Sequence, residues 1–342
     1  MAKICVYGAG LVGCYLGGRL LASGCDVGFV GRARMADRLR AHGLTLSHYD
    51  GRRWQVAPAR VEVSTAADLA AAADLVLVTV KSAATETVAA ELAAVLRPGT
   101  IVVSFQNGLG NADALRAALP GNIVLAGMVP FNVIERGPGA FHQGSAGILA
   151  VQQAPAMRPF VDMFMKAALP LRQYADMLPV QWAKLLLNLN NAINALADLP
   201  LKQELSQRAY RRCLGLAQQE ALALLKQAGI RPARMTPLPA AWIPSVLGLP
   251  DAVFAWLGRA MLQIDPLARS SMSDDLAAGR ATEIDWINGE VVRLALSLGQ
   301  AAPVNALLCQ WVHEAERADS RPSWPGEALL ASLRGGWARQ RG

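Results

Sequence analysis

A glycine-rich turn near the start of the chain constrains the fold more than any other feature. Residues 4–7 are apolar or aromatic and predict a buried strand, and the next six residues open a predicted helix: Gly8, Ala9, Gly10, Leu11, Val12 and Gly13. In such a pattern Gly8 permits a tight turn, Gly10 lets a pyrophosphate approach the backbone, and Gly13 lets the helix pack closely on the strand. A second predicted strand at 26–30 completes a unit of the usual length. The pattern predicts an α/β fold in which these six residues bind a dinucleotide.

The end of the second predicted strand indicates which dinucleotide is bound. Proteins that bind NAD usually carry Asp or Glu here to bind the ribose 2′-hydroxyl, whereas this chain has Arg32 and Arg34. A guanidinium can hold a 2′-phosphate with two parallel hydrogen bonds, and a carboxylate would repel that phosphate. We therefore expect NADP, with Arg32 as the main phosphate contact and Arg34 as a weaker candidate. The alternative is that both arginines are solvated loop charges.

Length and composition indicate a globular protein of two domains. A chain of 342 residues is too long for one ordinary core, and 53% hydrophobic with 17% charged residues is typical of a folded protein. No apolar run is long enough to span a membrane, and because the chain starts directly in a strand we expect no signal peptide. The five cysteines show neither metal-ligand nor redox spacing. We therefore expect no metal, reduced thiols and a cytoplasmic location.

The formal net charge of +7 raises the question of nucleic acid. The arginines are spread along the sequence, and no run of Lys and Arg is interleaved with aromatic residues, so we expect no nucleic-acid partner. A basic surface also attracts anionic small molecules such as phosphates and carboxylates. The sequence leaves the oligomeric state open, with a homodimer among the alternatives.

Two further polar segments follow predicted strands. Residues 75–80 form the strongest strand pattern and lead into Lys81, and residues 100–104 lead into Asn107. Because ligands of parallel α/β sheets bind at the carboxyl ends of the strands, both side chains are candidate ligand contacts. Asn107 can donate and accept hydrogen bonds, which suits it to orient a carbonyl and a nicotinamide amide together. The alternatives are an ordinary surface lysine and an asparagine that caps the next helix.

The hydrophobic pattern divides the chain into a first domain at 1–176 and a second at 177–318. In the first, residues 44–56 predict a hairpin, and short strands from Gly121 onward predict an antiparallel extension of the sheet. The second is predicted to be all-helical, with helices at 181–197 and 206–228. A further helix with few breaks is predicted within 271–299.

Two segments of the second half stand apart from these helices. Residues 231–267 contain six prolines, which exclude one long helix and predict a helical insert with turns. Such an insert either forms a wall or lid over the active site or is a plain surface insert. The tail, 319–342, is rich in Arg and Gly and is expected to pack loosely or fray.

The predicted helix at 181–197 carries an unusual set of polar residues. Lys184, Asn188 and Asn191 are spaced i, i+4 and i+7, which puts an ammonium and two amides on one stripe of a leucine-rich helix. Asparagine is a poor helix former, so this concentration costs stability unless the side chains face something polar. The pattern favours a partly buried site that needs neutral donors and acceptors. The alternative is an outward-facing polar stripe.

A second group of polar residues lies within 269–290. Ser271 and Glu283 are twelve residues apart with helical patterning between them, so about three turns of helix would separate them. Thr282 or Asp285 could instead cap a helix, and Glu283 could be an ordinary surface acid. Spacing alone leaves these alternatives open.

Taken together and in this order, the motifs resemble the ketopantoate reductase (2-dehydropantoate 2-reductase) family. The resemblance extends from residue 3 to about residue 317. It rests on the glycine turn, Gln106-Asn107-Gly108, Trp182-Ala183-Lys184 with Asn188, Ser270-Ser271-Met272 with Asp275, and residues 282–289. It implies an N-terminal Rossmann domain followed by a helical domain, an active site in the cleft between them, and NADPH as the cofactor.

The resemblance also implies roles for individual residues. Lys184 resembles the catalytic lysine, which donates a proton or a strong hydrogen bond to the substrate carbonyl oxygen, and Glu283 resembles the acid that binds the substrate hydroxyl near that lysine. Arg32, Lys81 and Asn107 are expected to contact the cofactor. The expected substrate contacts are Asn107, Asn188, Asn191 and Ser271. The implied reaction is reduction of a 2-keto acid, foremost 2-dehydropantoate to pantoate in pantothenate biosynthesis.

Two departures from the family pattern concern the substrate. Four residues after Asn188, where the family has a second Asn, this chain has Ala192, with Asn191 and Asn194 on either side. Three residues before Ser271, where pantoate-type enzymes have Asn, it has Ala268. An NADP-dependent reductase or dehydrogenase of another oxo or hydroxy acid is therefore an alternative. A protein that senses NADPH without turnover is a further one, although a sensor need not keep a proton donor such as Lys184.

Overall fold

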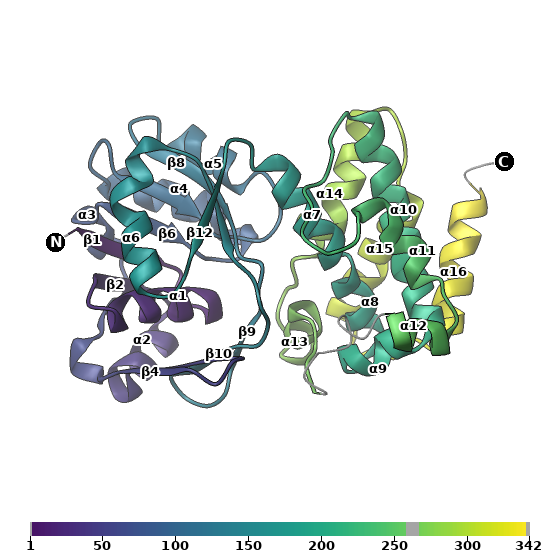
Figure 1. Cartoon of the computed structure of the whole chain (residues 1–342), viewed down its shortest axis with the longest axis horizontal. Helices are drawn as coiled ribbons and strands as arrows, with labels where there is room; N and C mark the ends of the chain where they lie inside the picture. Colours follow the sequence, from purple (N-terminus) through teal and green to yellow (C-terminus); the bar gives the residue numbers. More distant parts are fainter. Residues whose placement is uncertain (1, 258–266, 340–342) are drawn as a thin grey trace. The chain divides into compact units, whose positions relative to one another are not determined.

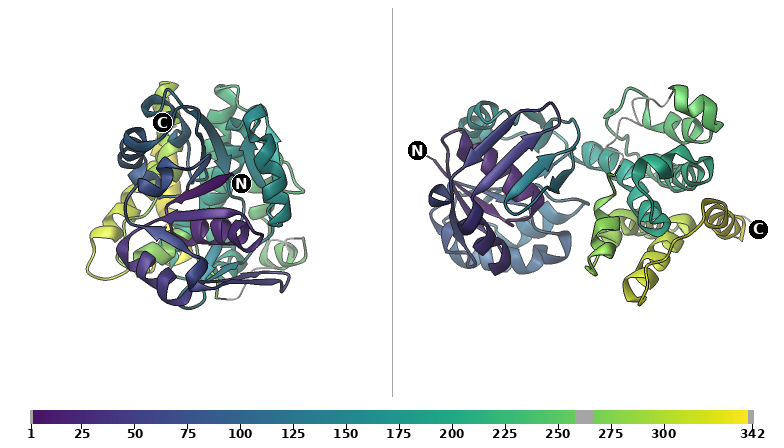
Figure 2. Two further views of the ribbon diagram at one scale, coloured as in Figure 1. Left: turned by 90° about the vertical axis from the view of Figure 1, so that its left-hand side faces the viewer. Right: turned by 90° about the horizontal axis from the view of Figure 1, so that it is seen from below.

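The computed structural model describes residues 2–257 and 267–339, without the side chains of residues 257 and 337–339. The chain forms two compact units that divide between Met177 and Leu178 (Figure 1, Figure 2). Residues 258–266 of the predicted insert and residues 340–342 of the predicted tail lie outside the described residues. Within the two described ranges, no helix is both long and apolar enough to cross a membrane.

The first unit is built on an eight-stranded sheet with the strand order β12-β11-β8-β7-β6-β1-β2-β5. The six strands from β8 to β5 are parallel, β11 is antiparallel to β8, and β12 is parallel to β11. Their bounds are β1 (Lys3–Tyr7), β2 (Asp26–Val30), β5 (Glu62–Ser64), β6 (Leu75–Val78), β7 (Ile101–Ser104), β8 (Ile123–Met128), β11 (Leu149–Gln152) and β12 (Leu171–Tyr174). This order, which reverses between β1 and β6, is that of a Rossmann-type fold.

Helices cover both faces of this sheet. On one face lie α1 (Leu11–Ala22) and α6 (Arg158–Lys166), which contact each other, and on the other lie α3 (Asp68–Ala71), α4 (Thr85–Val95) and α5 (Asn111–Ala118) (Figure 1). Right-handed crossovers on either side of β1 place the helices in this way. Another helix, α2 (Ala33–His42), lies beside β5 and ends at Gly43, whose φ of 65° stops the helix.

A second, four-stranded sheet has the order β4-β3-β10-β9. It joins β3 (Leu44–His48) and β4 (Arg53–Val56), the predicted hairpin, to β9 (Val133–Glu135) and β10 (Ala140–Gln143). The hairpin prediction is confirmed. The prediction of an antiparallel extension after Gly121 is wrong in part, because β8 pairs parallel to β7 and because β9 and β10 leave the main sheet to pair with the hairpin. Strand β11 continues the main sheet antiparallel to β8, and β12 pairs parallel to β11.

Helix α1 lies between the two sheets of the first unit and contacts strands of both (Figure 1). A Cβ on Gly17 would lie 2.5 Å from the ring of Phe29 in β2, and one on Gly18 would lie 2.9 Å from Leu46 in β3. These two helix positions must therefore stay small. The core around them is apolar, with fully buried Leu16 and Leu20 on the same helix.

The second unit consists of helices throughout its described residues. The long central helix α10 (Arg208–Gln227) contacts α8, α9, α11, α14, α15 and α16. The bounds of the others are α7 (Leu178–Asn188), α8 (Asn190–Ala197), α9 (Leu201–Ser206), α11 (Ile243–Leu247), α12 (Asp251–Leu257), α13 (Ser271–Ala277), α14 (Ile284–Ser297), α15 (Pro303–Arg317) and α16 (Gly326–Arg339). The predicted all-helical architecture is confirmed for these residues.

Two predicted helices are interrupted. The segment predicted as a helix over 181–197 starts at Leu178 and is broken at Leu189, between α7 and α8. The segment at 271–299 forms α13 and α14, because Gly279 adopts a φ of 59° and ends the first of them. The three helical turns expected between Ser271 and Glu283 do not exist.

The described part of the insert, residues 231–257, contains short helices with turns, as predicted. The fully buried Arg211 of α10 anchors it. Its guanidinium donates to the carbonyl oxygens of Leu247 (3.1 Å) and Leu249 (2.7 Å), pairs with Asp251 (2.9 Å) and lies 4.1 Å from the centre of the Phe254 ring. One charged side chain therefore holds α11 and α12 to α10.

The tail is packed as far as Gly336. Its helix α16 packs on α10 and α15 and buries Leu329, Leu330 and Leu333. Before the helix, Trp324 stacks on Trp311 with ring centres 4.9 Å apart. The prediction of a loose tail is wrong up to Gly336, because an apolar stripe within the Arg- and Gly-rich sequence supplies enough buried area to dock it.

We expect replacement of Arg211 by Met to lower the free energy of unfolding by about 3–5 kcal/mol, because several carbonyl groups and Asp251 would lose their partner inside the protein. Denaturant unfolding measures the change. The matched control is Arg208→Met on the same helix, where an exposed guanidinium makes one hydrogen bond to the Gly248 carbonyl oxygen at 2.8 Å. That variant should lose less than about 1 kcal/mol. Equal losses in the two variants would contradict the anchoring role of Arg211.

Candidate functional site

The glycine turn is fixed by contacts on three sides. Gly8 has a φ of 118°, and the backbone N–H groups of Gly8 and Ala9 both donate to the Val30 carbonyl oxygen at 2.9 Å. The Thr79 hydroxyl donates to the Gly8 carbonyl oxygen at 2.7 Å. A Cβ on Gly13 would lie 2.2 Å from that same oxygen, so no larger residue fits there. The turn is rigid because backbone from three strands meets at it.

Gly10 differs from its neighbours, because a Cβ built on it would meet no atom within 4 Å. It is the N-cap of α1, and no side chain caps the helix. By helix geometry the first N–H groups of α1 therefore have no partner within the helix, and the positive end of the helix dipole faces the open space beside Gly10. Open space, free N–H groups and a glycine backbone fit the diphosphate of a dinucleotide.

The strand register brings the predicted site residues of the first unit to one edge of the sheet. Tyr7 pairs with Val30 and with Val78, and Val78 pairs with Ser104, so four parallel strands end level. The segments that follow these ends carry the glycine turn, Arg32, Lys81 and Asn107. Arg32 and Arg34 are both exposed at the start of α2, and among the described residues neither guanidinium makes a hydrogen bond or an ion pair.

A buried polar network that sequence analysis missed joins the Lys81 and Asn107 segments. Asn111, 6% exposed, donates to the Asn107 carbonyl oxygen (2.7 Å) and to the Ser82 hydroxyl (3.1 Å). It accepts from Thr85 at 2.8 Å, and Ser82 also donates to the Asn107 carbonyl oxygen at 2.9 Å. The network fixes both loops against each other. Asn107 does not cap the next helix, because the N-cap of α5 is Gly110.

In the second unit, Lys184 lies half-buried in the middle of α7. Burial lowers the pKa of its ammonium to about 8. This direction is the reverse of the one that a neighbouring acid produces, and the expected effect of Glu283 on Lys184 stays a prediction. Asn188 is half-buried at the end of α7, on the same helix as Lys184. Asn191 is half-buried in α8, beyond the interruption at Leu189.

The serine motif and the acid each lie at the start of a helix. Ser271 is exposed at the first position of α13, and Ser270 is the N-cap, whose hydroxyl accepts from the Ser273 N–H at 3.1 Å. Glu283 lies half-buried just before α14. The N-cap of α14 is Glu283, so neither Thr282 nor Asp285 is the cap of this helix, although the Thr282 hydroxyl accepts from the Ile284 N–H at 3.3 Å. The catalytic and substrate roles assigned to these residues stay predictions.

A histidine that sequence analysis did not single out holds the turn before α14. His313 of α15 bonds Asp285 through Nε2 and Glu316 through Nδ1, each at 3.0 Å. Glu316 also accepts from the Thr282 N–H at 2.7 Å. Burial lowers the pKa of His313, but its hydrogen bonds to Glu316 and Asp285 outweigh this and raise it. The Thr282 backbone and the Asp285 side chain, on either side of Glu283, are therefore both bound to α15.

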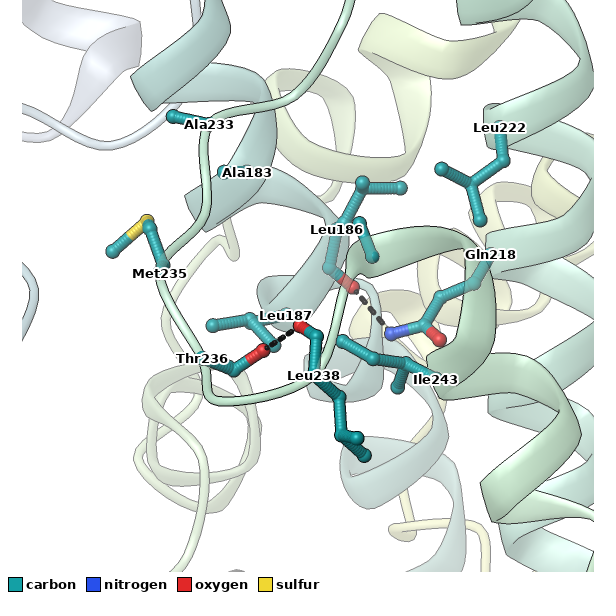
Figure 3. A pocket seen from close by; sticks show the side chains of 11 residues that line it. Ala183, Leu186, Leu187, Gln218, Leu222, Ala233, Met235, Thr236, Leu238 and Ile243 are labelled. Carbon is teal, nitrogen blue, oxygen red and sulfur yellow. Dashed lines mark hydrogen bonds between the residues drawn. The ribbon is translucent and has the colours of Figure 1, made fainter.

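Figure 3 shows a small, mainly apolar pocket between α7, α10 and the insert. Ala183, Leu186 and Leu187 of α7 line one side, and Met235 and Thr236 of the insert line another. Gln218 of α10 crosses it and donates to the Leu186 carbonyl oxygen at 3.0 Å. Residues that line the pocket between 233 and 243 of the insert thus pack against α7. The wall or lid over the active site stays a prediction.

The hydrogen bonds of His313 predict a pH-dependent contribution to stability. The folded protein holds the imidazolium proton more tightly than the unfolded chain does, so the contribution is fully present below the ordinary histidine pKa of 6.5 and is lost as the pH rises through the raised value. Glu316, whose pKa is lowered by its bonds to Thr282 and His313 although burial opposes this, must also stay ionised. We expect His313→Gln to lower the melting temperature most at about pH 5–6 and least above pH 8. The control is His42→Gln, at the exposed end of α2. A difference that grows with pH would contradict the prediction.

Comparison with known proteins gives the same answer for both units. The model of the family described as "Ketopantoate reductase PanE/ApbA" matches residues 4–156, and that described as "Ketopantoate reductase PanE/ApbA C terminal" matches residues 176–316. A 2-dehydropantoate 2-reductase of Caulobacter vibrioides is 28% identical over 253 residues, which are 72% of this chain and 79% of the relative.

Solved structures agree. A PanE/ApbA family ketopantoate reductase from Ralstonia eutropha JMP134 superposes with a TM-score of 0.77 and 30% identity, covering 92% of this chain and 98% of that one. D-mandelate dehydrogenase with NADH and anilino(oxo)acetate has a TM-score of 0.74 at 20% identity, covering 92% of this chain and 98% of that one, which shows a shared fold only. The resemblance found in the motifs is confirmed. The chain belongs to the ketopantoate reductase family of dinucleotide-dependent oxidoreductases.

Proposed function

We propose that this protein reduces a 2-keto acid to a 2-hydroxy acid with NADPH, and that its substrate is 2-dehydropantoate, which gives pantoate for pantothenate biosynthesis. The observation that carries the proposal is Lys184, a half-buried lysine in a family of reductases, whose pKa burial lowers to about 8. Relatives over most of the chain are named 2-dehydropantoate 2-reductase, for example one from Halobacterium salinarum at 26% identity over 330 residues. A cytoplasmic location fits this reaction.

Bound NADPH would supply the hydride. The turn at Gly8, Ala9, Gly10, Leu11, Val12 and Gly13 would hold the diphosphate, with Arg32 on the 2′-phosphate and Lys81 and Asn107 as further contacts. Lys184 would donate its proton to the substrate carbonyl oxygen, where negative charge grows in the transition state. Glu283 would bind the substrate hydroxyl, and Asn188, Asn191 and Ser271 would orient the substrate.

A second candidate is the same reaction on a different oxo acid. It is favoured by Ala268, which provides no amide where pantoate-type enzymes have Asn and contributes a backbone carbonyl that accepts from the Leu201 N–H at 2.8 Å. The test is to follow NADPH oxidation against a panel of 2-keto acids, with 2-dehydropantoate first. Turnover of another acid alone would establish the second candidate. NADPH binding without turnover of any acid would overturn both.

Replacement of Lys184 by Ala should lower kcat about 10²- to 10⁴-fold, because a positioned general acid contributes that much. NADPH affinity, measured by fluorescence titration, should stay within about twofold, since the lysine does not hold the diphosphate. In the parent enzyme kcat/KM should fall as the pH rises through about 8, where the ammonium loses its proton. Near-normal turnover of Lys184→Ala, or activity that increases through that pH, would remove the lysine from the mechanism.

Replacement of Arg32 by Ala should raise the KM for NADPH about 10- to 100-fold and leave the KM for NADH nearly unchanged, because a guanidinium–phosphate contact would be lost. The matched control is Arg34→Ala, which removes a second exposed charge from the same loop and helix start. Steady-state kinetics with both cofactors separates the outcomes. A similar loss with NADH and NADPH would show that Arg32 does not read the 2′-phosphate.

A further inference from the structure

The second unit contains a buried acid that the proposed mechanism does not use. Glu204 of α9 is 0% exposed. Its Oε2 accepts from the side-chain amides of Asn194 (2.7 Å) and Asn190 (3.2 Å), and its Oε1 is buried without a hydrogen-bond partner. Within the described residues no cation pairs with it. A carboxylate in such surroundings is costly, so the geometry favours the neutral acid.

The amide of Asn194 extends this contact to the serine motif. Asn194 is itself 0% exposed, and its Oδ1 accepts from the Ser270 backbone N–H at 2.9 Å. The Ser270 hydroxyl then donates to the Asn191 carbonyl oxygen at 3.2 Å and accepts from the Ser273 N–H at 3.1 Å. One hydroxyl can make both bonds, since it has one hydrogen and two lone pairs. Ser270 therefore joins α8 to the start of α13.

The ends of this chain of bonds are the two predicted substrate contacts of the region. Asn191 provides the carbonyl that Ser270 binds, and Ser271 follows Ser270 at the first helical position. Both have half-buried or exposed side chains and can meet a ligand. We infer that Glu204, through Asn194, and Ser270 are positioning residues that hold Asn191 and Ser271 in the arrangement which binds the keto acid. The inference rests on the proposed function only for the substrate roles of Asn191 and Ser271.

The ionisation of Glu204 offers an independent readout. Burial raises the pKa of Glu204 from an ordinary 4.5 to about 8. The groups near it on α10 are Tyr210 and Cys213, whose pKa values burial also raises, and Arg211, which pairs with Asp251 of α12. Between pH 4.5 and 8 the unfolded chain releases the Glu204 proton and the folded protein keeps it, so rising pH disfavours folding. Glu204→Gln has no proton to lose and should gain in melting temperature over the parent as the pH rises from about 5 to 8.

The test compares Glu204→Gln, Glu204→Leu and Ser270→Ala in the full chain. Gln keeps a neutral acceptor and should retain the parent KM for the keto acid, whereas Leu should raise that KM about tenfold because two amides lose their acceptor. Ser270→Ala should raise it by a similar factor, and the KM for NADPH should change less than about twofold in all three. Controls are Tyr210→Phe, which removes one buried hydrogen bond to the Trp324 carbonyl oxygen, and Ser206→Ala at the exposed end of α9. Both should leave the KM for the keto acid unchanged.

Amide hydrogen exchange makes the test independent of turnover. Glu204→Leu should speed exchange of the Ser270 and Ser273 amides while the amides of α1 keep their parent rates, and Glu204→Gln should leave all of them unchanged. A lower melting temperature with unchanged KM and unchanged exchange would reduce Glu204 to a structural residue and overturn the inference. A rise in the KM for the keto acid that is as large in Glu204→Gln as in Glu204→Leu would also overturn the inference. If no keto acid is turned over by the parent, the proposed function fails, and the exchange rates still decide whether Glu204 holds Ser270. If Glu204→Leu does not fold, the KM of Ser270→Ala for the keto acid decides: an unchanged KM would overturn the inference.

Discussion

The close approach of helix α1 to strand β1 is the contact on which the first unit depends. A Cβ at Gly13 would overlap the Gly8 carbonyl oxygen, and one at Gly17 would overlap the ring of Phe29. Any larger residue would push the helix away from the sheet and take its N-terminus out of line with the level ends of β1, β2, β6 and β7. The helix dipole, the open space beside Gly10 and the side chains of the neighbouring loops act together only at this distance.

Buried asparagine side chains link separate segments in both units. Asn111 joins two loops of the first unit, and Asn194 and Asn305 join helices of the second. An amide donates and accepts at once, so it can bridge two segments without the cost of a buried charge. Two of the buried acids of the second unit, Glu220 and Glu204, show the contrast. Glu220 accepts from the Val304 and Asn305 N–H groups at the start of α15, where a helix dipole favours an anion, whereas Glu204 accepts only from side-chain amides.

The parts of this structure that a sequence can predict are those whose signal is local. The glycine turn, the buried strands and the hairpin at 44–56 follow from residues within a few positions of one another. Pairing partners are different. Strand β10 joins β3 across about ninety residues of sequence, and nothing in the short segment Ala140–Gln143 indicates that partner. The break after α13 did have a local signal, Gly279, which the regular apolar pattern on both sides concealed.

The candidate site divides in the same way. Side chains that follow a strand or start a helix were predictable, because their position relative to the sheet edge follows from the order of elements. The residues that fix these side chains in place could not be predicted from the sequence. Glu204 and His313 lie in segments rich in polar residues, where a charged side chain is predicted to be solvated. Only the folded structure shows that Glu204 contacts Asn194 and that His313 contacts Asp285. Whether a charged side chain is buried depends on which helices pack over it, and these helices are far away in sequence.

The state of Lys184 illustrates how such burial acts on chemistry. Its neighbours Trp182, Leu185 and Leu186 are buried, and the leucine-rich helix withholds water from the ammonium. The resulting pKa of about 8 leaves the group mostly protonated at neutral pH but makes it a stronger acid than a solvated lysine. This lowered pKa suits the proton-donor role that we propose for Lys184, and the apolar residues of α7 contribute the burial that causes it.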